Sequence, residues 1–324
     1  MNTQSILDHR LLLVTGKGGV GKSTTAATLA VAAARTGRRT CLVEVEERHT
    51  MPVLFDTEQW DFTEREVRPQ LFGMAVDPEA SLQQYLEMFY GAKRLSKLVV
   101  HSTAVEFATA TAPGITDVLL IGKVKEIERR RDADGRFHYD LVIVDAPPTG
   151  RIINFLRSPE ATIELAGIGP VRQQAQSVAD MLTDPNRTRA IVTTLLEEMP
   201  VTETIESVRA LRDLQVAVGP LIANRVMPER FDPASAERLD GELDAQHLAA
   251  RAKSAGAEVD AEGIATLQGE ANAYRERLAL QQRMRSVLDE ELPQPRIELF
   301  ERYAEHFGPQ EISALAEIVE EIVA

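Results

Sequence analysis

The sequence contains little cysteine and little histidine, which excludes several covalent and metal-binding frameworks. Cys41 is the single cysteine among 324 residues, so the chain cannot form an internal disulfide. Cys41 lies in an apolar run that predicts a buried strand, and a lone thiol of this kind favours a reducing cytoplasm. The six histidines are scattered along the sequence, and their spacing predicts no metal cluster.

Long apolar runs and an excess of positive charge are also lacking. No stretch has the roughly 18 consecutive apolar residues of a membrane span, and the N-terminal residues lack the apolar core of a signal peptide. We therefore expect neither direct membrane insertion nor export. The 36 basic and 50 acidic residues give a net charge of −14, which disfavours nucleic acid or an anionic membrane as the main partner. The acidic stretch from Tyr303 to Ala324 has no lysine or arginine, so an anionic bilayer would repel it and we expect its helix to dock on the domain.

The most informative stretch is a glycine-rich loop, GKGGVGKST, at Gly16–Thr24. It follows the apolar run Leu11–Val14 and precedes an alanine-rich helical segment, so a strand leads through the loop into a helix. Its glycines allow several backbone amides to converge on an anion at a helix N-terminus. Lys22 is placed to reach the β and γ phosphates, and the Ser23 hydroxyl is placed for Mg²⁺. The predicted phosphate-binding residues are Gly16, Lys17, Gly18, Gly19, Val20, Gly21, Lys22, Ser23 and Thr24.

Polar residues at the ends of other predicted strands are further site candidates. Glu46 follows the predicted strand Thr40–Val45, and Asp145 ends the apolar run of YDLVIVDAPP. Because the carboxyl ends of parallel strands line the ligand crevice, both are candidate catalytic groups. An aspartate in the position of Asp145 usually holds Mg²⁺ through water. Asn224 ends another apolar run, and its amide could read an adenine edge or simply form a turn.

The alternation of apolar runs and helical patterns predicts an α/β fold. We expect a P-loop NTPase with a mostly parallel, doubly wound sheet and inserted helical subdomains. Residues 1–324 are interpreted as a single domain, with a helical insertion at about 77–135 and a helix-rich segment at about 232–292. Further strands are expected at 71–77, 189–196, 216–226 and 296–300. Residues 147–150, PPTG, are interpreted as a switch loop that senses the γ phosphate.

The ordered landmarks resemble those of the ArsA-type ATPases, which include the arsenite-pump ATPase and the GET/TRC tail-anchored-protein targeting ATPase. The landmarks are GKGGVGKST, the acidic segment at Glu46, PGITD from Pro113, DAPPTG from Asp145, the LLEEMPVTET segment with Glu197 and Glu203, and IANR around Asn224. The likeness is strongest to actinobacterial ArsA-like proteins described as anion-transporter ATPases.

The resemblance implies a magnesium-dependent ATP hydrolase that binds ATP and Mg²⁺. It implies that Lys17, which is typical of deviant P-loop ATPases, crosses a dimer interface to the partner's nucleotide. Ser23 and Asp145 would belong to the Mg²⁺ and water network, and Asn224 to adenine recognition. The family's water-orienting aspartate, normally followed by proline, aligns with Glu46. Because glutamate is one methylene longer, we expect slow hydrolysis. We count Lys17, Lys22, Glu46 and Asp145 as catalytic candidates.

Departures from the family pattern bear on cargo. A single cysteine per chain cannot build a three-thiolate arsenite site, nor the iron–sulfur ligation of nitrogenase-reductase relatives. The CxxC zinc pair and the long methionine-rich insertion of many targeting members are absent from the sequence.

The leading hypothesis is a cytoplasmic ATPase that acts as a nucleotide-gated dimeric switch, coupled to a transport or targeting partner. The dimer would be a homodimer or a heterodimer with a related ATPase, and a membrane-protein partner or client could hold it peripherally at a membrane. One alternative is an ATP-binding regulatory module with negligible turnover. The other is a chaperone or targeting factor for hydrophobic segments, with an apolar groove formed by residues 77–131 and 151–188.

Overall fold

The computed structural model describes residues 6–45, 49–90, 114–165, 169–229 and 245–323. A short 3-10 turn at Ile6–Asp8 leads into the first strand. Within these residues the chain forms an eight-stranded sheet in the order β3-β4-β2-β5-β1-β6-β7-β8. The strands are β1 Leu11–Gly16, β2 Thr40–Glu44, β3 Arg65–Arg68, β4 Leu71–Ala75, β5 Leu141–Asp145, β6 Thr188–Thr194, β7 Leu221–Val226 and β8 Arg296–Phe300.

Seven of the strands run parallel, as expected for an α/β fold. β1 lies in the centre, paired with β5 on one side and β6 on the other. Its residues Leu11–Val14 are buried on both faces, which explains the continuous apolar run in the sequence. Cys41 in β2 is fully buried, and burial raises the pKa of its thiol. The predicted α/β architecture with a mostly parallel sheet is therefore confirmed.

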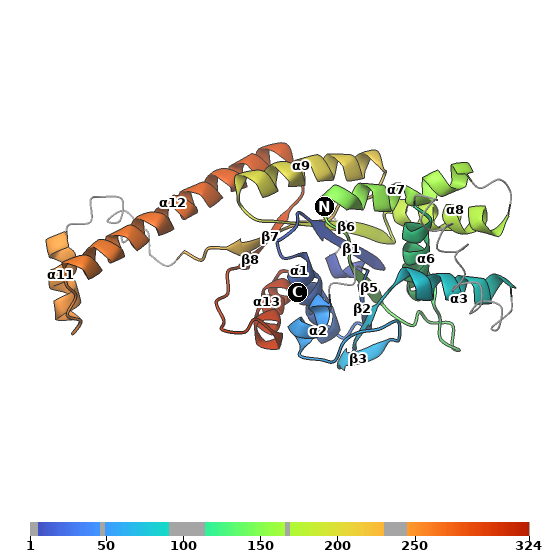
Figure 1. The fold of residues 1–324 in the computed structure, drawn as a ribbon, viewed down its shortest axis with the longest axis horizontal. Helices are drawn as coiled ribbons and strands as arrows, with labels where there is room; N and C mark the ends of the chain where they lie inside the picture. The colour runs from blue at the N-terminus through green and yellow to red at the C-terminus, as the bar shows by residue number, and fades with distance from the viewer. Residues whose placement is uncertain (1–5, 46–48, 91–113, 166–168, 230–244, 324) are drawn as a thin grey trace.

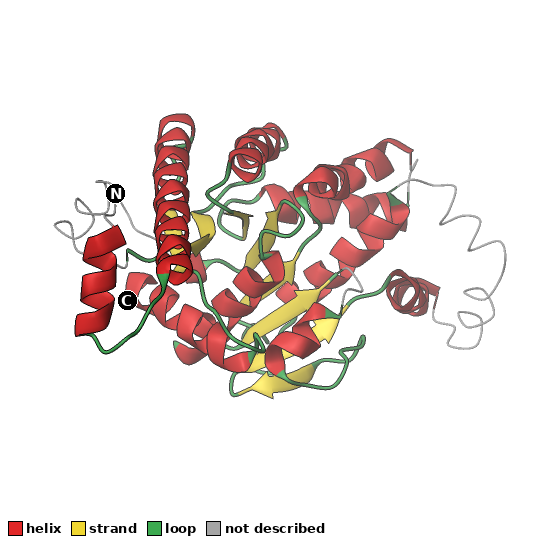
Figure 2. Cartoon of the chain, turned by 60° about the vertical axis from the view of Figure 1, so that its left-hand side comes forward, coloured by secondary structure: helices red, strands yellow, loops and turns green. Residues whose placement is uncertain are grey.

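Helices cover both faces of this sheet (Figure 1). One face packs on α1 Lys22–Arg35, α2 Thr50–Phe55 and α13 Pro309–Val323. The other face packs on α6 Ile115–Arg129, α7 Thr149–Leu165, α8 Pro170–Thr183, α9 Glu198–Asp213 and the end of α12 Ala261–Glu291. The remaining helices are α3 Pro78–Tyr90, which packs on α6, and α11 Ala245–Ser254, which packs on α12. Figure 2 shows the layers from a second direction.

The sequence interpretation missed β3. This strand has the sequence REVR and pairs antiparallel with β4 at the edge of the sheet. Its exposed or half-buried charged residues give no apolar run, so only the neighbouring apolar segment suggested a strand. Gln70 adopts a positive φ of 66° between the two strands, where the chain reverses. The predicted strand at 71–77 is therefore the fourth strand in chain order and ends at Ala75.

Two C-terminal helices differ in how much they pack. Helix α13 packs along α1 and buries Ile312, Leu315, Ala316 and Val319, so the predicted docking of this helix is confirmed. Helix α12 extends away from the sheet and carries α11 near its far end (Figure 1). Its C-terminal half contacts α9 and buries Leu288, whereas few residues of its first half are buried. None of the described helices is long and apolar enough to cross a membrane.

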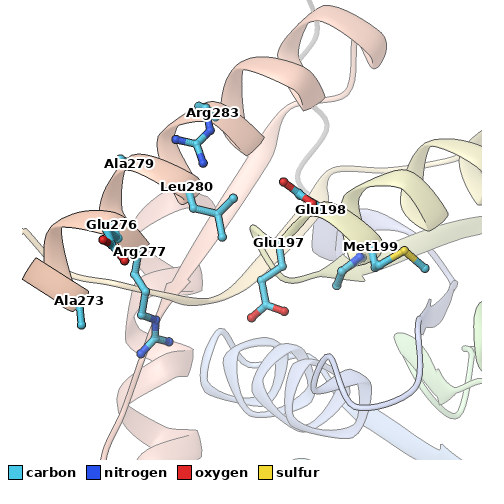
Figure 3. Close-up of a pocket in the computed structure, with 10 residues that line it drawn as sticks. Glu197, Glu198, Met199, Ala273, Glu276, Arg277, Ala279, Leu280 and Arg283 are labelled. Carbon is cyan, nitrogen blue, oxygen red and sulfur yellow. The ribbon is translucent and has the colours of Figure 1, made fainter.

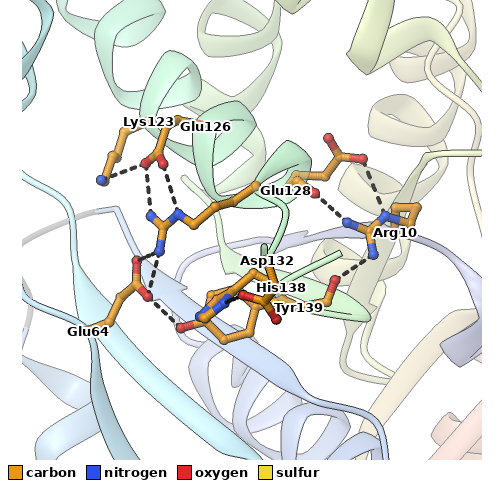
Figure 4. Close-up of polar contacts among 9 residues, drawn as sticks. Arg10, Glu64, Lys123, Glu126, Glu128, Asp132, His138 and Tyr139 are labelled. Carbon is orange, nitrogen blue, oxygen red and sulfur yellow. Dashed lines mark hydrogen bonds and ion pairs between the residues drawn. The ribbon is translucent and has the colours of Figure 1, made fainter. Parts of the chain in front are cut away.

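Ion pairs fix the amino-terminal edge of the sheet, opposite the glycine loop (Figure 4). The carboxylate of Glu128, on α6, is 2% exposed. Its Oε1 lies 3.6 Å from Arg10 Nε, and its Oε2 lies 2.7 Å from Arg187 Nη2. Arg10 precedes β1 and also donates to the carbonyl of Tyr139, before β5. Glu128 therefore connects a helix to the starts of three adjacent strands.

Beside this connection, Arg130 organises a second set of contacts, and its partners Glu64 and Glu126 are labelled in Figure 4. Its guanidinium contacts Glu126 at 2.9 Å and Glu64 at 2.7 Å. Glu126 also accepts from Lys123 at 2.8 Å, and Tyr139 donates to Glu64 at 2.5 Å. These contacts attach α6 to the segment before β3, far from the glycine loop in the sheet.

Removal of the Glu128 carboxylate should destabilise the fold without weakening nucleotide binding. Glu128→Ala leaves two arginines without their shared acceptor, and we expect a loss of about 2 kcal/mol, below the roughly 3–5 kcal/mol of a fully buried pair because Arg187 is partly exposed. Urea denaturation measures this loss. The control is Glu291→Ala, which removes the exposed pair with Arg209 and should change stability by less than about 0.5 kcal/mol. Equal stability of the two variants would contradict the assignment.

Candidate nucleotide-binding site

The glycine loop lies at the carboxyl end of the central strand. β1 ends at Gly16, and α1 begins at Lys22. Gly19 and Gly21 have φ values of 87° and 91°, a left-handed conformation that residues with a Cβ resist. The loop therefore presents backbone amides at the N-terminus of a 14-residue helix, which is a general anion-binding geometry. The side chain of Lys22 is buried at this point.

A hydroxyl and a carboxylate meet directly behind the loop. Ser23 Oγ donates to Asp145 Oδ2 at 2.6 Å. Asp145 ends β5, and its backbone pairs with Val14 of β1 and Glu44 of β2. The structure thus brings together two residues that lie 122 positions apart and that the sequence predicts as a Mg²⁺ site. Hard oxygen donors of this kind suit Mg²⁺.

Asn224 packs against the same loop from β7. Its side chain is 6% exposed, and its Nδ2 donates to the carbonyl of Val20 at 2.9 Å. A Cβ added at Gly21 would lie 2.2 Å from Asn224 Nδ2, so the glycine is required by this close approach. In the structure the Asn224 amide therefore supports the loop, and adenine recognition by this residue stays a prediction.

Lys17 is held by a carboxylate of its own chain. Lys17 Nζ lies 2.5 Å from Glu203 Oε1 of α9, and each side chain is 31% exposed. Glu203 Oε2 also accepts from Thr149 Oγ1 at 3.3 Å. Glu203 therefore bridges the glycine loop and the start of α7. In the sequence Glu203 is a landmark of the family resemblance only, and no local pattern predicts its contact with Lys17.

The predicted switch segment at 147–150 is partly helical. Thr149 and Gly150 are the first residues of α7, whereas we expected a loop through all four positions. The helix begins here because the amides of Arg151 and Ile152 both donate to the carbonyl of Pro148, and Pro148 itself has no amide hydrogen to donate. Thr15 Oγ1 donates to the carbonyl of Pro147 at 2.7 Å, which fastens this segment to β1.

A buried glutamate, Glu44, is a second feature that the sequence interpretation missed. Its side chain is at the end of β2 and 2% exposed. Glu44 Oε1 accepts from the Thr50 amide at 3.0 Å. Burial raises the pKa of the Glu44 carboxyl, and the nearby Asp145 charge adds to this effect. A single charged residue inside the otherwise apolar run TCLVEV is the signal that could have identified it. The predicted residue Glu46 lies outside the described residues.

A cavity of about 860 Å³ lies apart from these residues. It is lined by Glu197, the N-cap of α9, by Glu198 and Met199 of its first turn, and by residues of α12 that include Arg277 and Arg283 (Figure 3). None of the predicted site residues lines it. The candidate site is therefore the surface formed by the loop, Asp145 and Asn224, and this cavity is a separate feature.

The parallel sheet, the loop between β1 and α1, and the Ser23–Asp145 contact define the chain as a P-loop NTPase. The family model described as "Anion-transporting ATPase" matches residues 9–166 and 164–251. The chain belongs to this family, the ArsA ATPases, and is accordingly an ATP-hydrolysing enzyme.

Three relatives show how far this similarity extends. The chain is 40% identical to the ATPase BagA of Mycobacterium tuberculosis, over 90% of this chain and 86% of the relative. It is 25% identical to the ATPase GET3 of Candida glabrata, over 69% of this chain and 74% of that protein. It is 27% identical to the arsenical pump-driving ATPase of Acidiphilium multivorum, over 67% of this chain and 40% of that protein. The predicted ArsA-type resemblance is therefore confirmed.

Gly21→Ala should disturb the loop even without nucleotide. The added Cβ would be strained at a φ of 91° and would clash with Asn224, so we expect a loss of about 1–3 kcal/mol in the free energy of unfolding. Urea denaturation of the nucleotide-free protein measures it. Gly18→Ala in the same loop is the control, because no atom lies within 4 Å of its added Cβ. A Gly21→Ala protein as stable as the Gly18→Ala protein would show that the close approach is unimportant.

Proposed function

We propose that the chain is a magnesium-dependent ATPase that works as a nucleotide-gated dimer and relays its state to a transport or targeting partner. The observation that carries the proposal is the Ser23–Asp145 contact at 2.6 Å directly behind the glycine loop. In this interpretation residues 1–324 form one ATPase domain, which is supported by strands from Leu11 to Phe300 that share one sheet and by α13, which packs back on α1.

The residues of the loop fit a magnesium nucleotide. Backbone amides from Gly16 to Thr24 would bind the phosphates, and the Lys22 ammonium would pair with the β and γ phosphates. Ser23 and Asp145 would hold the hydrated cation through hard oxygen atoms. When bound, Mg²⁺ would neutralise charge on the phosphates. Glu46 is our proposed group for orienting the attacking water, and Asn224 our proposed contact to adenine.

The dimer proposal is supported by the position of Lys17. Its ammonium group is partly exposed and pairs with a partly exposed carboxylate, and such pairs contribute roughly 0–1 kcal/mol. A nucleotide phosphate of a partner subunit could therefore displace Glu203 at little energetic cost. Because Glu203 also contacts Thr149, release of Lys17 would change the contacts at the start of α7. The helices on that face of the sheet would then respond to whether nucleotide is bound.

The transport or targeting role is inferred from the relatives. One relative is named as an arsenical pump-driving ATPase, which supports an ATPase coupled to a membrane-protein partner. We propose a homodimer or a heterodimer with a related ATPase. We place the protein in the cytoplasm, peripheral to a membrane only through such a partner. The excess of acidic residues agrees with a protein partner, since it disfavours direct contact with an anionic bilayer or a nucleic acid.

Turnover of ATP by the wild-type protein and by Lys22→Ala tests the hydrolase. Loss of the ammonium group that faces the transferred phosphate should lower the rate at least about a hundredfold. Lys253→Ala on exposed α11 is the control and should keep the wild-type rate. Equal rates in all three proteins would show that Lys22 does not assist the transfer of the phosphate. Release of about one phosphate per chain by the wild type would instead support the regulatory module with negligible turnover.

Two substitutions at the Lys17–Glu203 pair should act in opposite directions on ATP-dependent dimerisation. Lys17→Ala should retain nucleotide binding but impair dimerisation, because the partner's nucleotide loses a cationic contact. Glu203→Gln should lower the ATP concentration needed for dimerisation by about two- to fivefold, because a neutral amide holds Lys17 less strongly. Sedimentation velocity at graded ATP concentrations measures both. Unchanged dimerisation in both variants would count against an interface role for Lys17.

A further inference from the structure

The buried carboxylate of Glu44 faces the same region as the Ser23–Asp145 contact. β2 and β5 are parallel neighbours, and Glu44 pairs in register with Asp145. Residues paired in this way point to the same face of a sheet, with strands about 4.8 Å apart. Leu42 and Ile143 pair with each other on these two strands, and both pack on the face of the sheet that α1 covers. Glu44 and Asp145 each lie two residues further along the same strands, so their side chains point to that same face.

The two carboxylate oxygens of Glu44 have different surroundings within the described part of the chain. Oε1 accepts from the Thr50 amide at 3.0 Å, and the Met51 amide also lies close to this carboxyl. Oε2 is buried, and among the described residues it has no hydrogen-bond partner. A buried carboxylate oxygen without a donor is costly, and it is usually retained where a cation or a bound water completes the site. Asp145 lies opposite Glu44 on the next strand, so two carboxylates occur side by side at this end of the sheet.

We propose that Glu44 supplies a second carboxylate to the magnesium–nucleotide site, where Oε2 accepts a hydrogen bond from a water of the hydrated cation. The inference rests on the proposed function, since it requires nucleotide and Mg²⁺ at the glycine loop. Mg²⁺ binds through one or two carboxylates and keeps several waters, so Asp145 and Glu44 together match its requirements. Glu44 is a positioning residue in this scheme.

The same carboxylate connects the site to the chain beyond β2. Through Thr50, Glu44 fastens the first residue of α2, which follows the segment that contains Glu46. Glu44 could therefore have a purely structural role at the start of this helix. A glutamine distinguishes the two roles, because its amide oxygen can still accept from Thr50 but carries no charge for the hydrated cation.

Manganese binding tests the proposal without relying on turnover. The full chain is titrated with Mn²⁺ in the presence of ADP, and free Mn²⁺ is followed by electron paramagnetic resonance. Glu44→Gln should raise the half-saturating Mn²⁺ concentration by about tenfold, the lower end of the range for groups that orient metal ligands. ADP affinity without metal should stay within twofold of wild type. Glu44→Asp, which keeps the charge, should recover part of the Mn²⁺ affinity.

Glu66→Gln is the control, because it removes an exposed carboxylate from the edge strand β3. It should leave Mn²⁺ affinity within twofold of wild type. An Mn²⁺ affinity of Glu44→Gln within twofold of wild type, or equal losses in Glu44→Gln and Glu44→Asp, would overturn the role of the Glu44 charge. If the wild-type chain itself binds no Mn²⁺ and ADP, the proposed function fails with it. Urea denaturation of each variant shows whether it is folded under the titration conditions.

Discussion

The register between β1, β5 and β2 is the constraint on which the site depends. Parallel pairing aligns Val14, Asp145 and Glu44 across three central strands. Because each strand is buried on both faces, a shift by one residue would turn Asp145 away from Ser23 and bury its charge on the other face. The apolar residues of these strands stabilise the core and also fix the register, which determines which carboxylates lie next to the glycine loop.

The two edges of the sheet use charge differently. At the amino-terminal edge, Glu128 pairs with two arginines, and Arg130 pairs with two glutamates. At the carboxyl edge, the contacts leave room for change: Lys17 is held by one partly exposed carboxylate, and Glu44 has a buried oxygen without a partner among the described residues. This asymmetry is physically reasonable, since a fixed edge anchors the strands while the other edge can respond to a ligand.

Much of this architecture could be predicted from the sequence because its signals are local. The loop GKGGVGKST, the apolar runs of the buried strands and the helix after the loop each depend on neighbouring residues, and the structure agrees with them. Asp145 was predicted because it ends such a run. By contrast, the contacts of Glu203 with Lys17 and Thr149 span 186 and 54 positions. No local pattern indicates which of the acidic residues on α9 will face the loop.

Other differences arose where charge concealed a local signal. β3 consists mainly of charged residues, and its strand conformation depends on pairing with β4 rather than on its own apolar content. Glu44 is hidden for the opposite reason, since one charged residue within an apolar run does not alter the strand pattern of that run. The register with Asp145 became apparent only when the order of the strands was known.

The length of α12 has a mechanical consequence. Gln281 accepts from the amide of Met227 and donates to the carbonyl of Arg225, so the helix is fastened beside Asn224 at the end of β7. Nearer its N-terminal end, Tyr274 Oη donates to the carbonyl of Pro228 at 2.9 Å. From Tyr274 to Ala261 the helix extends for about 20 Å at 1.5 Å per residue. A tilt of roughly 10° about Tyr274 would move α11 by about 3 Å, given that length, so a displacement too small to disturb the core could become a much larger one at α11.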